Sequence, residues 1–211
     1  DIEVQEARIM SKKVEFHYDF ASPNSYLSHR VIPGIEERTG AKFIYVPILL
    51  GGVFKATNNR SPMEQFAEVK NKKEYNSKET ERFIKKHSID KYYRNPHFPV
   101  NTLLIMRGAC YSLGKDFGSD YIEAMFQCMW ERGLNMNDST IIGDVLSEYG
   151  LPTSEIVAGT QDPAVKKILI DQTSSSVAKG NFGSPTFFVG NEMFFGKDRL
   201  GEVEEEILNN K

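Results

Sequence analysis

Cysteine is scarce in this chain. Its 211 residues include only two, Cys110 and Cys128, and both lie in stretches with a helical, partly apolar pattern. No two cysteines stand at redox spacing, which argues against disulfide exchange through a C-x-x-C motif. We predict that both are reduced residues of the core.

Several other signatures are also missing. The four histidines are dispersed without zinc spacing, so no metal is implied: His17, His29, His87 and His97. There is no G-x-S-x-G elbow or Walker loop to support a hydrolase or a nucleotidase. Residues 1–13 hold no apolar signal core, and no run approaches the roughly 18 apolar residues that cross a bilayer. With a net charge of −3 and scattered lysines, nucleic acid and membranes are not expected partners, and we expect a soluble, cytoplasmic protein.

The apolar patterns that are present predict a sheet interrupted by helices. Alternation from Val14 to Phe20 predicts a half-buried strand. A helix over about 25–38 and a strand over 42–46 would complete a β-α-β unit. The stretch from 51 to 179 contains no convincing strand. Its apolar periodicity predicts helices over 63–73, 77–87, 102–113, 120–132, 139–149 and 163–179. One apolar helical face there is predicted to be core: Met125, Phe126, Met129 and Trp130.

A hairpin and a last helix are predicted to complete the chain. Its strands would cover 186–189 and 192–195, and the helix would begin near Asp198, a natural N-cap. The order β-α-β, helical block, β-β-α predicts an α/β, thioredoxin-like fold with an all-helical insertion. Its N-terminal half would cover 14–50, the insertion 51–179 and the C-terminal half 180–211.

The segment that follows the first strand, D-F-A-S-P-N-S-Y, carries the most chemistry. It lies where a thioredoxin-like protein has C-P-x-C, but Ser22 and Ser25 take both sulfur positions. Ser22 is a good N-cap and Pro23 suits the first helical turn, so the helix should present its N–H groups to an anion. In a redox protein that anion is the protein's own thiolate. Here the thiolate must arrive on another molecule, for which glutathione is the obvious candidate.

A second signal precedes the predicted third strand. In Gly183-Ser184-Pro185-Thr186 the proline stands at a strand entrance. In thioredoxin-like folds this proline is cis and faces the helix terminus, so the Ser184 backbone could pair with the cysteinyl unit of glutathione as an added strand. The alternative is an ordinary trans Ser–Pro bond at a strand start.

Four segments together resemble the 2-hydroxychromene-2-carboxylate isomerases, the bacterial relatives of kappa-class glutathione transferases. They are 19–27 (DFASPNSYL), 49–59 (LLGGVFKATNN), 98–102 (FPVNT) and 196–200 (GKDRL). The resemblance covers nearly the whole chain after Lys13. It implies a DsbA-like fold, a homodimer, and glutathione bound without being oxidised.

The resemblance also implies roles for single residues. Ser22 would donate a hydrogen bond to the glutathione sulfur and favour its thiolate; the alternative is a plain helix cap. Asn59 would hold the glutathione backbone, or be no more than a turn residue. Lys72 would reach the glycyl carboxylate, although Lys70 and Lys73 compete and all three suit a solvated helix face.

At the last helix the resemblance implies the γ-glutamyl subsite. Asp198 would accept from the γ-glutamyl ammonium and Lys197 would offer its backbone N–H to the carboxylate, unless both only cap the helix. Ser184 is expected to act through its backbone alone. Tyr92, Arg94 and Asn101 are candidates for the polar groups of a small aromatic substrate.

The activity that the resemblance implies is the isomerisation of 2-hydroxychromene-2-carboxylate, or a related aromatic catabolite, to trans-o-hydroxybenzylidenepyruvate. Glutathione would be a cofactor whose thiolate adds to the conjugated double bond, allows it to rotate and leaves again. Two alternatives remain open: a kappa-like transferase that conjugates glutathione to electrophiles, and a thiol-binding module without catalysis.

Overall fold

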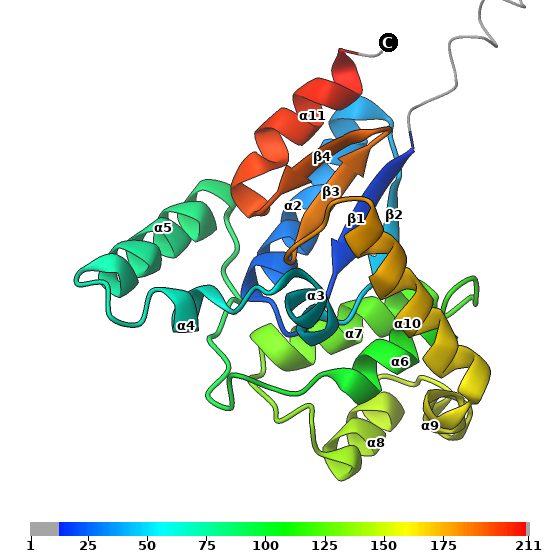
Figure 1. The fold of residues 1–211 in the computed structure, drawn as a ribbon. Helices are drawn as coiled ribbons and strands as arrows, with labels where there is room; N and C mark the ends of the chain where they lie inside the picture. Colours follow the sequence, from blue (N-terminus) through cyan, green and yellow to red (C-terminus); the bar gives the residue numbers. More distant parts are fainter. Residues whose placement is uncertain (1–12, 210–211) are drawn as a thin grey trace, which may run out of the picture.

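The computed structural model describes residues 13–209, which form a four-stranded sheet surrounded by helices (Figure 1). The strand order is β2-β1-β3-β4. β1 and β2 are parallel, whereas β3 is antiparallel to both β1 and β4. The predicted β-α-β unit and hairpin are therefore confirmed. The strands are β1 (Val14–Tyr18), β2 (Phe43–Pro47), β3 (Thr186–Val189) and β4 (Glu192–Phe195).

The prediction of a half-buried β1 is wrong, because every residue of the strand is buried. The polar face carries Glu15 and His17, and the C-terminal part of α10 (Pro163–Ala178) covers it. His17 contacts Glu15 at 2.8 Å through Nε2 and Ser176 at 2.7 Å through Nδ1. Lys179, just after α10, lies 2.5 Å from Glu15. Polar alternation here therefore reflects hydrogen-bonded side chains beneath α10 and not a solvated face.

Helix α2 (Pro23–Thr39) packs on the opposite face of the sheet together with α11 (Leu200–Leu208). The Ser22 side chain accepts from the Ser25 N–H and caps the N-terminus of α2. Gly40, at a φ of 73°, ends the helix in the left-handed conformation that glycine adopts at little cost. The first helix was thus predicted correctly, with both ends shifted by one or two residues.

The segment between β2 and β3 is helical and, within the described residues, contains no strand, as predicted. Figure 1 shows α6 to α9 gathered beyond one end of the sheet, while α5 projects sideways. The helices are α3 (Leu50–Thr57), α4 (Pro62–Gln65), α5 (Lys72–His87), α6 (Leu103–Tyr111), α7 (Gly118–Trp130), α8 (Ser139–Glu148), α9 (Thr153–Gln161) and α10.

One prediction in this segment was wrong, and two helices were missed. The helix over 63–73 is only the single turn α4, which a capping box of Ser61 and Glu64 starts. Its residues are exposed, so no buried face extends it. Helices α3 and α9 were not predicted. For α3 the reason is that it contains Gly51 and Gly52, which are poor helix formers.

The apolar face of α7 is core, as predicted: Met125, Phe126, Met129 and Trp130 are all fully buried. The indole N–H of Trp130 donates to the Phe20 carbonyl at 2.7 Å. This bond ties the insertion to the segment that leads into α2. No helix within residues 13–209 combines the length and the apolarity of a membrane span.

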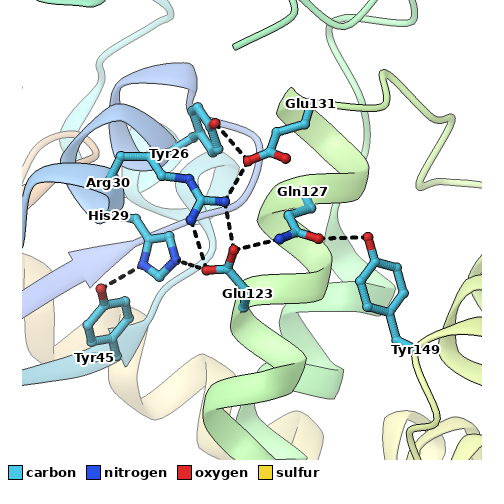
Figure 2. Close-up of polar contacts among 8 residues, drawn as sticks. All are labelled: Tyr26, His29, Arg30, Tyr45, Glu123, Gln127, Glu131 and Tyr149. Carbon is cyan, nitrogen blue, oxygen red and sulfur yellow. Dashed lines mark hydrogen bonds and ion pairs between the residues drawn. The ribbon is translucent and has the colours of Figure 1, made fainter. Parts of the chain in front are cut away.

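A polar network joins α2 to α7 (Figure 2). Arg30 contacts Glu123 at 2.7 Å and Glu131 at 2.6 Å. His29 bridges Glu123 at 2.8 Å and the Tyr45 hydroxyl at 2.7 Å. Burial lowers the pKa of His29, while its bond and that of Arg30 bring the pKa of Glu123 to about 2. The network anchors α2 about two turns beyond Ser22 and so holds its N-terminus in place.

Candidate functional site

Ser22 and the loop before β3 meet at one end of the sheet, as the two sequence signals predicted. The Ser22 hydroxyl donates to the Ser184 carbonyl at 3.0 Å and accepts from the Ser25 N–H at 3.2 Å. The Ser184–Pro185 peptide bond is cis. A helix N-terminus, a hydroxyl and the carbonyl before the proline therefore converge on one point.

The side chain of Ser184 takes part in this contact, although only its backbone was expected to matter. Its Oγ lies 2.8 Å from the Ser25 Oγ and accepts from the Asp19 N–H at 3.1 Å. Both serines of the S-P-N-S motif thus bind the same loop residue, one through its carbonyl and one through its hydroxyl. Ser25 stands where a redox protein has its second cysteine, and its hydroxyl is hydrogen-bonded to that of Ser184.

The carboxyl group of Asp19 lies beneath the site and was not predicted as a site residue. Its Oδ1 accepts from Ala21 N–H at 2.9 Å and from Thr102 Oγ1 at 2.6 Å, and its Oδ2 accepts from Leu50 N–H at 2.8 Å. Burial raises the pKa of Asp19, and this effect outweighs the three hydrogen bonds, each of which lowers it. This group connects β1, the start of α2, the start of α3 and the residue before α6. In the sequence, the one signal for Asp19 was its place at the start of the D-F-A-S-P-N-S-Y segment.

Asn59 lies at the same loop. It follows the end of α3, where Asn58 takes a left-handed conformation with a φ of 53°. The Asn59 Nδ2 donates to the Phe182 carbonyl at 2.8 Å. Its side chain therefore holds the loop at Phe182, two residues before Ser184.

Lys197 and Asp198 lie at the other side of the loop, since Gly196 N–H donates to the Pro185 carbonyl at 3.0 Å. Lys197 is buried, with its ammonium 4.8 Å from the Phe83 ring and 2.8 Å from Asp198 Oδ1. The prediction that Asp198 caps the last helix is wrong. It lies inside a 3-10 turn, η2 (Lys197–Arg199), and α11 begins at Leu200 without a side-chain cap.

The remaining predicted residues contact their own neighbours. Lys72 lies over the Phe66 ring at 5.2 Å, and Arg94 lies 5.3 Å from the Phe98 ring. Asn101 Oδ1 accepts from the Leu103 N–H at 3.0 Å.

Tyr92 is the member of this set that reaches α2 and α7. Its ring lies 6.0 Å from that of Tyr26 and is stacked on Trp130 at 6.3 Å. No described contact joins Lys72, Tyr92, Arg94 or Asn101 to Ser22, so their roles stay predictions.

Both cysteines are free and buried, as predicted. Burial raises the pKa of Cys110 to about 12 and that of Cys128 to about 11. Neither provides a thiolate at neutral pH, and they lie on α6 and α7. The described residues also contain no group of three or more histidine, cysteine or acidic side chains that could hold a metal ion.

Fold and site together define a thioredoxin-like protein without redox cysteines. The chain belongs to the DSBA-like thioredoxin domain family, whose model matches residues 13–208. It is similar to a 2-hydroxychromene-2-carboxylate isomerase of Sphingobium xenophagum, at 26% identity over 202 residues that cover 95% of this chain and 100% of the relative. It is also similar to glutathione S-transferase kappa 1 of Caenorhabditis elegans, at 26% identity over 203 residues that cover 89% of this chain and 87% of the relative. A solved structure of 2-hydroxychromene-2-carboxylate isomerase has a TM-score of 0.80 at 25% identity, covering 93% of this chain and 94% of that chain.

Proposed function

We propose that this protein is a glutathione-dependent isomerase that converts 2-hydroxychromene-2-carboxylate, or a related aromatic catabolite, to the trans benzylidenepyruvate. The observation that carries the proposal is the Ser22 hydroxyl at the N-terminus of α2, 3.0 Å from the carbonyl before the cis proline. The similarity to isomerases over nearly the full chain supports the reaction. The similarity to a glutathione transferase supports the cofactor.

The residues at this end of the sheet fit a glutathione thiolate. Bound glutathione would supply a sulfur nucleophile that adds reversibly to the substrate's conjugated double bond. Ser22 would donate its hydroxyl hydrogen to the sulfur, and the positive end of α2 would favour the charged form. The Ser184 carbonyl would accept from a ligand amide N–H, which frees the Ser22 hydroxyl to turn to the sulfur.

Residues that flank this loop, together with Lys72, are the proposed partners of the two ends of glutathione. Lys197 would offer its backbone N–H to the γ-glutamyl carboxylate, and Asp198 would accept from the γ-glutamyl ammonium. Asn59 would hold the glutathione backbone, with Lys72 as the proposed partner of the glycyl carboxylate. Tyr92, Arg94 and Asn101 remain the proposed contacts of the aromatic substrate. The homodimer, the cytoplasmic location and the insertion over 51–179 belong to the same proposal.

The rival function is a kappa-like transferase, which the similarity to such an enzyme favours. One assay separates the two: the absorbance of the benzylidenepyruvate is followed while free glutathione is titrated. We expect product only when glutathione is present and no change in the glutathione concentration. Consumption of one glutathione per product would establish a transferase instead. Binding of glutathione without turnover of any electrophile would leave a thiol-binding module.

A further inference from the structure

A cavity of about 230 Å³ lies between α3, α6 and α10. None of the residues proposed to bind glutathione lines it. Its walls are mainly apolar and include Leu49, Leu103, Leu169 and Val177. On α3, the two lining residues are Gly52 and Ala56, which are four positions apart and so lie on the same side of the helix. Because neither has a side chain larger than a methyl group, this side of the helix leaves room for the cavity. A volume just below the usual range of ligand pockets suits a small molecule.

Two cations face this cavity from different helices, Arg107 of α6 and Lys166 of α10. Both are only partly exposed. Within residues 13–209 neither of them has a carboxylate partner, in contrast to Lys167, which pairs with Asp171 at 2.5 Å. A cation beside an apolar wall is less well solvated than one in open water, so an anion that binds there gains more from it. Among the described residues, no acidic residue lines this cavity beside Arg107 and Lys166, so an anionic ligand could take the place of a carboxylate partner.

The rim of the cavity also carries apolar surface in water. Ile170 lines the cavity and is 64% exposed. An apolar wall, an exposed isoleucine and two cations without carboxylate partners together match a ligand with an apolar body and one negative end.

We infer that this cavity binds a small amphipathic carboxylate, with its apolar body among the leucines and its carboxylate at Arg107 and Lys166. Arginine is suited to this role, because its guanidinium can hold both carboxylate oxygens. The inference is independent of the Ser22 site and does not require the proposed isomerase activity.

The test is calorimetric titration of the protein with trans-cinnamate, with cinnamamide as its neutral counterpart. We expect cinnamate to bind and the amide to bind about tenfold or more weakly, since the amide cannot form charge-assisted bonds. Arg107→Gln and Lys166→Gln should each weaken cinnamate binding, Arg107→Gln by about tenfold. Ala56→Phe should abolish it by filling the cavity. Saturating glutathione should leave the cinnamate affinity unchanged.

Lys167→Gln is the matched control, because it removes a cation from the next position of α10 but does not line the cavity. Its cinnamate affinity should equal that of the wild type. Circular dichroism melts of all variants identify any that fail to fold. Absence of cinnamate binding, equal affinities for cinnamate and cinnamamide, or unaltered binding in Arg107→Gln would overturn the inference. Displacement of cinnamate by glutathione would do the same, since it would place the ligand at Ser22.

Discussion

Replacement of Ser22 by alanine removes the hydroxyl that we propose to stabilise the glutathione thiolate. A hydrogen bond to a charged group contributes about 1.5–3 kcal/mol, which corresponds to roughly one to two pKa units. The donor favours the thiolate, so its loss should raise the pKa of the bound thiol by that amount. Ultraviolet absorbance of the thiolate, followed against pH in the presence of saturating protein, measures the shift. Isomerase turnover at neutral pH should fall in parallel.

The same substitution has a structural cost that must be separated from the effect on the thiol. Ser22 caps α2 and donates to the Ser184 carbonyl, and loss of an N-cap costs about 1 kcal/mol. Urea unfolding should report this loss while the protein remains folded. Ser25→Ala is the control, since it removes the hydroxyl pair with Ser184 but leaves both Ser22 bonds. A bound thiol with the same pKa in Ser22→Ala and wild type would refute the role of the hydroxyl.

Three further predictions follow from other contacts. Gly183→Ala should weaken glutathione binding severalfold, because its Cβ would lie 2.7 Å from the Phe195 ring. Gly201→Ala is the control and should leave binding unchanged, since its Cβ meets nothing within 4 Å. Equal glutathione affinities of the two variants in a binding titration would contradict the prediction. Burial raises the pKa of Glu15, but hydrogen bonds from Lys13, Lys179 and His17 outweigh this effect and lower the pKa from 4.5 to about 2. The stability from this group is therefore present above about pH 4.5 and lost as the pH falls through 2; Glu15→Gln should lack that part of the acid-dependent loss in urea unfolding, and an unchanged profile would count against it. Neither native cysteine should react with an aromatic disulfide reagent at neutral pH, whereas both should react in urea; rapid native labelling would show that they are accessible.

The sequence was sufficient to predict where Ser22 and Ser184 meet, because each lies in a short motif with a known place in the fold. The cap residue, the proline that follows and the proline at the strand entrance are local signals. The strand positions of the hairpin were equally local. These features do not depend on what packs around them.

Tertiary contacts decided the features that were missed. The burial of Glu15 and His17 depends on Ser176 and Lys179, which lie about 160 positions further along the chain. The role of Asp19 depends on donors from Leu50 and Thr102. No spacing in the sequence indicates such partners, so a polar residue on a strand suggested solvent. Helix α3 was missed for a related reason, since packing against α10 and not propensity stabilises it.

A crystal structure of the protein with glutathione tests the central claim most directly. The account predicts the glutathione sulfur within hydrogen-bonding distance of Ser22 Oγ, at the N-terminus of α2, with a ligand amide N–H on the Ser184 carbonyl. The Ser22 hydroxyl should then have left that carbonyl. A sulfur that points away from Ser22, or glutathione bound elsewhere on the protein, would contradict the account.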